Sequence, residues 1–366
     1  MTNAMSASID RLFSDAATYF RTTAIRYRSL GSPFYEGLAR LCAEDSELMA
    51  IAAETPKGQP YNHIFFGAVH FLLLGDPGDP FARYFGLGGN APVADAATFA
   101  ALKDFCRRRR DEIVTLLKTR TVQYTMVNRA SFVVAMMGHA LRSGATEPLS
   151  LIEVGSSAGL LTVFDHYHYD FGAYGRLGDP ASPAVKVAKF EGKPPPIPDH
   201  MPKIVERVGI DLFPVDPLDP VERRWLEGLM APDMYDDRRV LKQALDARAR
   251  IPLATIKGDA LLKVPEVLSG MSGTICLLHS FCLYQWPAAL QNDFHDMLCA
   301  QSRGRTLYRL SVDMIHDNPA LPDVRPRTAE EELVMDMTMV TYRDGEARWD
   351  FLGRCDTWGR RVHWLA

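Results

Sequence analysis

The sequence predicts a protein of the α/β class, in which a helical segment precedes a mostly parallel, doubly wound sheet. Residues 1–145 carry apolar side chains at helical spacing and contain no strand-like run. After residue 150, short runs rich in Val, Ile and Leu alternate with helical or polar segments, which is typical of a sheet with connecting helices. We therefore expect a helical cover domain at 1–145 and a sheet domain at 146–366.

Four segments of the first part have helical periodicity. They are IDRLFSDAATYFRTTAIRY, SPFYEGLARLCAEDSELMAIAAET (two short helices), TFAALKDFCRRRRDEIVTLLKTR (one long helix) and SFVVAMMGHALRSG. The apolar run at 64–74 is too short to cross a membrane, which takes roughly 20 residues, and predicts a buried helix. The four arginines at 107–110 are flanked by Asp104, Asp111 and Glu112, so they predict a solvated helix face rather than a basic patch.

The second part contains the strand signals. Apolar runs predict strands at 151–154, 204–210, 253–257, 274–278 and 307–312. In the segment LVMDMTMVTYRDGEARWDFLG, the pair Asp344-Gly345 lies between alternating stretches and predicts an antiparallel hairpin at the edge of the sheet. The stretch at 191–203 is rich in proline and predicts a loop.

Composition and charge limit the class of function. The formal net charge is −4 at pH 7, which gives no reason to expect a nucleic-acid partner. The six cysteines are scattered and include no C-x-x-C pair, which favours a reducing cytoplasm over a disulfide framework or a zinc site. The N-terminal stretch lacks the basic start and apolar core of a secretory signal. We expect a cytoplasmic protein with a small-molecule partner and no membrane partner; the oligomeric state is left open.

Small and acidic residues follow the predicted parallel strands, at the edge where open α/β sheets bind their ligands. The strands end in Gly155–Gly159 (GSSAG), in Asp211, in Gly258-Asp259-Ala260, in His279-Ser280 and in Asp313. Because consecutive strands deliver such residues to one edge, we expect a nucleotide-like cofactor there.

Each residue has a chemical role if the cofactor is S-adenosylmethionine. Glycines let the loop backbone come close, and its N–H groups at a helix N-terminus attract a carboxylate. Glu153 would order the loop or meet the ammonium group, Asp211 would accept from the ribose hydroxyls, and Asp259 would meet the adenine amino group. The alternatives are structural: Asp259 caps the following helix, and Asp211 belongs to a turn.

The loop, GIDLFPVD, KGDALL and LLHSFCLYQWP together resemble the bacterial domain-of-unknown-function family 2332. The likeness covers most of the chain, including GSPFYEGLARLCAEDSEL and the closing RCDTWGRRVHWLA. That family is similar to class I S-adenosylmethionine-dependent methyltransferases, so the resemblance implies a Rossmann-like methyltransferase sheet and this cofactor. It assigns cofactor binding to Glu153, Gly155, Ser156, Ser157, Gly159, Asp211, Asp259 and Ala260, and it puts His279 and Ser280 beside the transferred methyl group.

The sequence departs from the usual pattern of such enzymes in two places. Ser157 stands where the loop has its middle glycine. Asp211 lies 56 residues past Gly155 (211 minus 155), where roughly 20 is normal for the ribose-binding acid. The extra length implies an insertion at about 165–203, which we expect to cover the site as a lid.

A hydrolase is the alternative interpretation of the same loop, because G-x-S-x-G also marks a nucleophile, here Ser157. Chain order permits a triad of Ser157, Asp313 and His363. The nucleophile turn of such hydrolases usually comes late in the sheet, whereas no strand is predicted before residue 150. The methyltransferase interpretation is therefore favoured.

His279 and Tyr284, which follow the fourth strand, are the candidates for chemistry. His279 would suit removal of a proton from the acceptor, since imidazole titrates near neutrality. A packed, hydrogen-bonded histidine at the strand end is an equally good interpretation.

Four further residues are candidates to line a substrate pocket: Asp165 and Tyr169 in DHYHYD, and Asn128 and Arg129 before the sheet domain. The histidines of DHYHYD, two positions apart, have a spacing that can bind metal, but an aromatic packing segment is favoured and no metal site is predicted. For Asn128 and Arg129 the structural alternative is a helix–helix hydrogen bond.

The function expected from the sequence is a small-molecule methyltransferase that uses S-adenosylmethionine. The second hypothesis is a non-catalytic module that keeps the cofactor pocket, because the middle glycine is missing and no proline-rich catalytic tetrapeptide follows the fourth strand. The sequence does not define the acceptor atom.

Overall fold

The computed structural model describes residues 15–87, 89–123, 126–315, 318–321 and 335–366. The chain forms two compact units, one built from residues up to 124 together with 219–239, and the other from 125–218 together with 240–366. The border in the first half of the chain thus falls at 124/125, whereas the sequence suggested 145/146. The start of the first expected helix, before residue 15, and Leu333-Val334 of the expected hairpin lie outside the described residues.

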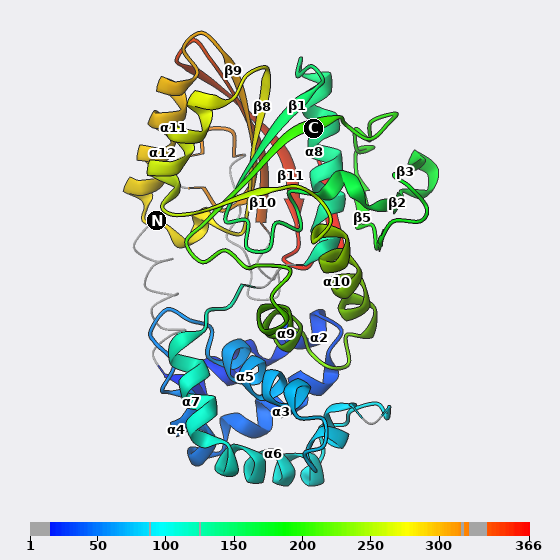
Figure 1. Cartoon of the computed structure of the whole chain (residues 1–366), viewed down its shortest axis with the longest axis vertical. Coiled ribbons are helices and arrows are strands. Elements are labelled where there is room, and N and C mark those ends of the chain that lie inside the picture. Colours follow the sequence, from blue (N-terminus) through cyan, green and yellow to red (C-terminus); the bar gives the residue numbers. More distant parts are fainter. Residues whose placement is uncertain (1–14, 88, 124–125, 316–317, 322–334) are drawn as a thin grey trace. The chain divides into compact units, whose positions relative to one another are not determined.

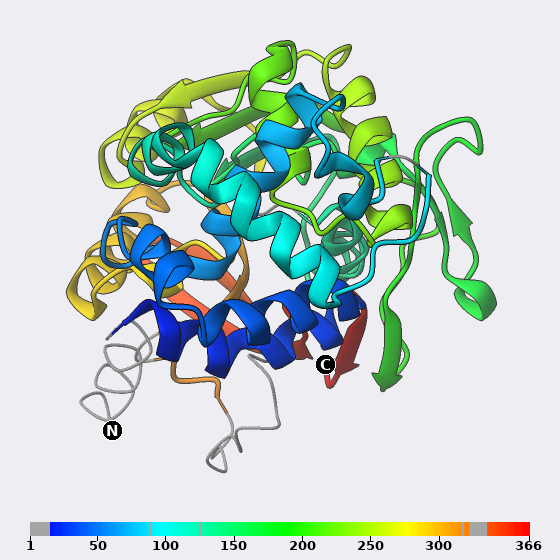
Figure 2. The same cartoon turned by 90° about the horizontal axis from the view of Figure 1, so that it is seen from below.

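The first unit is helical, and its described residues contain no strand. Its helices are α2 (Ala16–Ser29), α3 (Pro33–Ala43), α4 (Ser46–Ala52), α5 (Tyr61–Gly75), α6 (Ala96–Arg108), α7 (Arg110–Thr119) and α9 (Pro220–Gly228); those up to residue 119 are blue to cyan in Figure 2. Asp15, Asp45 and Asp95 cap α2, α4 and α6 by accepting a backbone N–H of the first turn. An aromatic cluster fills the interior, where the ring of Tyr35 stacks on Phe66 at 4.5 Å.

The segment expected to be one long helix is divided into α6 and α7. Arg109 lies between them with φ −111° and ψ 20°, outside the helical range. The arginine run is paired with acids, as predicted for a solvated face: Arg107 with Glu47, Arg108 with Asp79 and Asp104, and Arg109 with Asp76 and Glu112.

Residues 219–239 belong to the helical unit because they pack against α5. A Cβ at Gly228 would lie 3.0 Å from the carbonyl oxygen of Gly67, so the two backbones approach through small residues. Nδ1 of His70 lies 2.9 Å from the carbonyl oxygen of Met230. The run at 64–74 falls within α5 and is buried along almost all of its length, as predicted. Among the helices that the structure describes, none combines the length and apolarity required to span a bilayer.

The second unit is built on a nine-stranded sheet with the order β5-β12-β11-β10-β9-β8-β1-β6-β7. The strands are β1 (Leu149–Val154), β5 (Lys189–Gly192), β6 (Ile204–Asp211), β7 (Ala254–Lys257), β8 (Thr274–Ser280), β9 (Thr306–Asp313), β10 (Met335–Arg343), β11 (Glu346–Cys355) and β12 (Arg361–Trp364). From β7 to β9 all neighbours are parallel, while β10, β11 and β12 are antiparallel additions and β5 pairs in parallel with β12. The five predicted apolar runs fall on parallel strands of this mostly parallel sheet, apart from residue 253, which precedes β7.

The turn between β10 and β11 is the one predicted from Asp344-Gly345. Both residues have positive φ, 53° and 88°, as a two-residue hairpin turn of type I′ requires. Asparagine, aspartate and glycine tolerate this conformation best, which explains why this pair was a reliable signal.

Helices cover both faces of the sheet (Figure 1). Figure 1 shows α11 (Ala260–Gly270) and α12 (Ala288–Gln301) along one face and α8 (Ala130–Arg142) along the other. The core under α11 and α12 includes Ile152, Val208, Leu277 and Val340. A Cβ at Gly138 of α8 would overlap the carbonyl oxygen of Pro196, so glycine is required there for the proline-rich stretch to pack on the helix.

The expected insertion folds into strands and turns. It contains a small sheet of β2 (His168–Asp170), β3 (Arg176–Leu177) and β4 (Ala184–Val185), in addition to β5. Residues 193–203 form no strand or helix, as expected of a proline-rich loop, whereas residues 191 and 192 belong to β5. The α-helix expected directly after the first strand is absent: turns at 157–163 lead into a short 3-10 helix, Phe164–His166.

Two histidines of the helical unit, the buried His70 and the partly buried His63, should make it sensitive to acid. Burial lowers the pKa of His63 to about 4 and that of His70 to about 3. Below pH 6.5 the unfolded chain therefore binds more protons than the folded one, and stability falls as pH falls. We expect His70→Gln to reduce this loss by about 1.4 kcal/mol per pH unit between pH 6 and 4.

The measurement is urea unfolding of wild type and variant across that pH range. The control is His200→Gln, because the His200 side chain is 71% exposed. Identical pH slopes for wild type and His70→Gln would contradict the prediction.

Candidate functional site

The topology creates a switch point at β1. The chain passes from β1 to β6 and β7 on one side, and then returns to β8 and β9 on the other side of β1. This is the 3-2-1-4-5 order of doubly wound sheets, in which the loops at the carboxyl ends diverge beside the first strand and leave room for a ligand. The residues that the sequence singled out at the ends of β1, β6 and β8 therefore lie on neighbouring strands.

The loop after β1 has a left-handed backbone at alternate positions. Gly155, Ser157 and Gly159 have φ of 75°, 49° and 72°, and this is why no right-handed helix begins there. A Cβ at Gly155 would lie 2.7 Å from Sγ of Cys282, and one at Gly159 would overlap Leu253, so both positions also require glycine for packing. Ser157, which replaces the usual middle glycine, still takes a conformation that favours glycine.

Asp211 joins this loop to the end of β6. Its Oδ2 accepts the backbone N–H of Ser157 at 2.7 Å, and its Oδ1 accepts that of Phe213 at 2.8 Å. The turn role considered for Asp211 is thus present, together with a contact to the loop. The side chain is half-buried, and each carboxylate oxygen can accept a further hydrogen bond.

Glu153 lies beneath the loop with a polar environment of its own. It is 3% exposed, and burial raises its pKa to about 8. The hydrogen bond that Thr162 Oγ1 donates to it acts in the opposite direction and lowers the pKa. Arg248 approaches from α10 (Tyr235–Arg248), and burial lowers the pKa of its guanidinium. Its Nη1 donates to the carbonyl of Ile251 at 3.0 Å, while its buried Nε has no hydrogen-bond partner.

Three serine hydroxyls at this edge are buried and have no hydrogen-bond partner: those of Ser156, Ser157 and Ser280. Ser156 packs over Gly209 of β6, where a Cβ would lie 2.6 Å from the serine oxygen. Buried hydroxyls normally find a partner in the protein or in a bound molecule. These three hydroxyls, at the ends of β1 and β8, therefore mark the carboxyl edge of the sheet as a candidate binding site.

Asp259 and Ala260, the expected adenine side, have structural contacts. Oδ1 of Asp259 accepts the N–H of Leu261 at 2.8 Å and caps α11, which is the alternative considered from the sequence. Ala260 is buried in the core under α11.

His279 is fully buried, and both of its ring nitrogens are engaged. Nδ1 lies 2.7 Å from Oδ2 of Asp313, and Nε2 accepts Nε–H of Arg309 at 3.0 Å. Burial, together with the charge of Arg309, lowers the pKa of His279. These contacts favour the packed, hydrogen-bonded role over that of a catalytic base.

Tyr284 contributes its backbone, whose N–H donates to Oδ1 of Asp313 at 3.0 Å, while its side chain is 39% exposed. It therefore lies at the surface of the loop after β8, where its backbone helps to hold the loop around Asp313.

The expected substrate residues make internal contacts. Asp165 pairs with Arg207 of β6, and the hydroxyl of the buried Tyr169 donates to the carbonyl of Phe164 at 2.6 Å. Oδ1 of Asn128 accepts the N–H of Lys186 at 3.2 Å. The structure does not gather these side chains at the loop after β1, so their contacts favour packing roles.

Arg129 is the exception, because it contacts the loop after β8. Its guanidinium stacks 3.8 Å from the ring centroid of Phe281 and donates to the carbonyl of Thr357. Phe281 itself has a left-handed backbone with φ 57°, next to Ser280.

The residues of the hydrolase interpretation are not brought together. Asp313 is occupied by His279 and by backbone N–H groups at 282, 283 and 284. His363 lies on β12, five strands from β1, and neighbouring strands are about 4.8 Å apart, so it is on the order of 20 Å from the loop. Within the described residues, no group of three or more His, Cys, Asp or Glu side chains is arranged to hold a metal ion.

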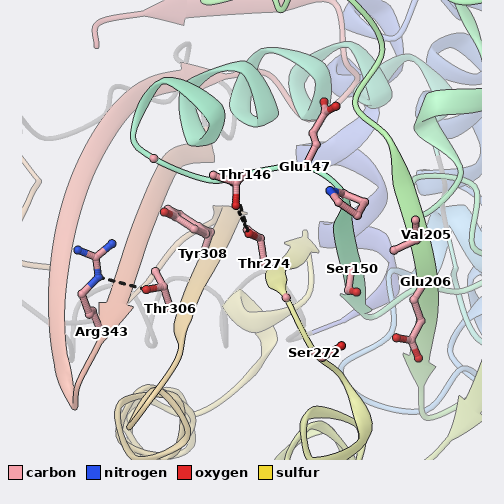
Figure 3. A pocket seen from close by; sticks show the side chains of 13 residues that line it. Thr146, Glu147, Ser150, Val205, Glu206, Ser272, Thr274, Thr306, Tyr308 and Arg343 are labelled. Atoms are coloured by element: carbon pink, nitrogen blue, oxygen red, sulfur yellow. Dashed lines mark hydrogen bonds between the residues drawn. The ribbon is translucent and has the colours of Figure 1, made fainter.

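A cavity of about 540 Å³ lies at the opposite edge, among the amino ends of the strands (Figure 3). Figure 3 shows Thr146 beside Thr274 and Arg343 beside Thr306, pairs joined by hydrogen bonds of 3.0 and 3.1 Å. Since ligands of such sheets bind at the carboxyl ends, this cavity is separate from the candidate site.

Sequence reasoning missed Thr162, Arg248 and Arg309. Only Arg309 had a signal, because a charged residue in the middle of the apolar run LYRLSV must be buried with a partner. Thr162 donates to Glu153, and Arg248 acts on Glu153 through its charge; no local pattern marks either residue.

The chain matches the family described as "Uncharacterized protein conserved in bacteria (DUF2332)" over residues 17–364, and it belongs to that family. This confirms the family resemblance noted from the sequence. No curated protein has a significant match to the chain.

The buried acid beneath the loop predicts a pH dependence. The pKa of Glu153 is raised from 4.5 to about 8, so between these values the folded protein binds more protons than the unfolded chain, and stability falls as pH rises. Glu153→Gln keeps an acceptor for Thr162 and cannot ionise. We expect wild type to lose about 1.4 kcal/mol per pH unit relative to this variant between pH 5 and 8.

Urea unfolding at several pH values measures this difference. Glu206→Gln is the matched control, because Glu206 is exposed on the neighbouring strand β6. Parallel stability profiles for wild type and Glu153→Gln would show that Glu153 is ionised in the folded protein.

Proposed function

We propose that the second unit binds S-adenosylmethionine at the carboxyl edge of β1, β6 and β8 and transfers its methyl group to a small molecule. The observation that carries the proposal is the contact between Asp211 and Ser157. This contact joins the loop after β1, which has a left-handed backbone, to the acid at the end of the neighbouring strand β6. Both lie at the switch point of the sheet.

The strand order supports a nucleotide-type ligand. In doubly wound sheets the acid that ends the second strand accepts from ribose hydroxyls, and the loop after the first strand approaches the ligand through its backbone. Asp211 is half-buried and retains acceptor capacity beyond its two backbone contacts. The antiparallel strands β10 and β11 beyond β9 are also compatible with the methyltransferase-like sheet expected from the sequence.

The polar groups of this edge fit such a cofactor. The hydroxyls of Ser157 and Ser280 lack protein partners and can bond to polar groups of a ligand. Glu153 is the buried acid nearest the loop, and a cationic group nearby would favour its ionised form. A ligand with an ammonium group is therefore suited to Glu153 below the loop. The N–H groups of Gly155, Ser156, Ser157 and Gly159 already donate to protein acceptors, so the serine hydroxyls are the donors that the loop offers to a carboxylate.

The chain's own residues would act by positioning. When bound, the cofactor supplies an activated methyl group on a sulfonium. With both nitrogens of His279 engaged, this histidine is not poised to take a proton, so the rate acceleration would come from aligning the acceptor with the methyl group. The same observation keeps the non-catalytic module as the second hypothesis.

Calorimetric titration with S-adenosylmethionine and S-adenosylhomocysteine tests binding. We expect micromolar binding by wild type and a loss of roughly 10- to 100-fold in Asp211→Ala, the scale of a hydrogen bond to a charged group. Asp216→Ala is the matched control, because Asp216 makes the same kind of turn contact, to the N–H of Leu218 at 2.8 Å.

The outcomes are distinct. A folded wild-type protein that binds neither compound would refute the proposal, and equal affinity of both variants would remove Asp211 from the site. Where binding is found, incubation with methyl-labelled cofactor and the low-mass fraction of a bacterial extract separates the two hypotheses. Labelled product supports methyl transfer, and its absence supports the non-catalytic module.

A further inference from the structure

A second cavity lies on the α12 side of the sheet, within the second unit. It measures about 310 Å³ and is lined by Asn292, His295, Asp296, Arg309, Ile315 and Trp349, among others. None of these residues belongs to the loop after β1 or to Asp211, so the cavity is not part of the cofactor site proposed above. Its volume is in the range of small-molecule sites.

Arg309 is the unusual member of the cavity wall. It projects from the middle of β9 and is only 1% exposed. Nε donates to Nε2 of His279, and Nη1 donates to the hydroxyl of Tyr342, both at 3.0 Å. Nη2 is buried and has no hydrogen-bond partner.

The hydrogen-bond acceptors of Arg309 do not neutralise its charge, and the carboxylate that lines the cavity, Asp296, forms no ion pair with it. Its two hydrogen-bond acceptors are a histidine and a tyrosine, and among the described residues it forms no ion pair with a carboxylate. Asp313 is reached only through the ring of His279. His295, which also contacts the Tyr342 hydroxyl at 3.0 Å, has its pKa lowered by burial and by Arg309. A buried cation without an anionic partner is costly, and an anion in the cavity would remove that cost.

One part of the wall is suited to a flat ring, while Gln291, Asn292 and Asp296 make another part polar. The rings of His295 and Trp349 lie 5.2 Å apart at 32°, and Ile315 adds an aliphatic surface. A guanidinium binds a carboxylate through paired, charge-assisted hydrogen bonds. Aromatic and aliphatic walls favour an organic acid over an inorganic anion.

We propose that this cavity binds a small aromatic carboxylate, whose carboxylate pairs with Arg309 and whose ring lies against Trp349. Benzoate is the probe, and benzamide is its neutral counterpart of the same shape. In calorimetric titrations at constant ionic strength, we expect saturable binding of benzoate. Benzamide should bind with an affinity that is lower by roughly tenfold or more, because only benzoate carries a negative charge that compensates the guanidinium.

Variants locate the site. Asn292→Trp should occlude the cavity and abolish benzoate binding, whereas Asp293→Trp on the next, non-lining position should leave it unchanged. Arg309→Met should abolish the preference for benzoate over benzamide. If that variant fails to fold, the Asn292 and Asp293 pair still decides. No benzoate binding by wild type, equal binding of benzamide, or full binding by Asn292→Trp would overturn the proposal.

Discussion

The carboxylate of Asp313 organises the centre of the second unit. It is 1% exposed and accepts four hydrogen bonds, from Nδ1 of His279 and from the backbone N–H groups of Cys282, Leu283 and Tyr284. A buried carboxylate is tolerated only when its acceptors are filled, so the loop after β8 must curl around it. That curl places Cys282 against Gly155 and thereby limits the loop after β1 to glycine at this position. The two loops at the switch point are thus shaped by one acid.

The same carboxylate also determines the hydrogen bonding of the polar side chains under α12. By fixing Nδ1 of His279, Asp313 leaves Nε2 as an acceptor for Arg309. Arg309 in turn donates to the hydroxyl of Tyr342, which also contacts His295. A line of polar side chains therefore runs through an otherwise apolar layer from β8 to α12. A histidine that looked suited to acid–base chemistry is the connecting member of that line.

The fold was largely predictable because its signals are local. Apolar runs and the Asp344-Gly345 pair mark the strands and the hairpin turn wherever the tertiary partners lie. The missing helix after β1 was not predictable from spacing, since its absence follows from the left-handed φ of Ser157, a residue that usually avoids that region. Similarly, residues 219–239 return to the helical unit because of contacts with α5 that no periodicity encodes.

The position of the candidate site, at the carboxyl edge of the sheet, was predictable from the sequence. The side chains that contact one another there were less predictable. Strand order follows from alternation of strands and helices, and it brings Gly155, Asp211 and Ser280 to neighbouring positions. Other contacts at this edge come from residues that no local pattern marks: Arg248 of α10 lies beside Gly159, and Thr162 in the turns after β1 donates to Glu153. Side chains such as Asn128 and Asp165 were chosen by their chemistry, and their contacts with Lys186 and Arg207 depend on packing that sequence alone does not give.

The pairing of β5 with β12 has a consequence for synthesis of the chain. Lys189–Gly192 has no other partner in the sheet, and its neighbour Arg361–Trp364 is made much later; Glu191 and Arg361, whose side chains meet, are 170 residues apart. While the ribosome adds the intervening residues, β5 has an unpaired backbone edge of the kind that promotes association between chains. Its short length and the charges of Lys189 and Glu191 protect this edge during that interval.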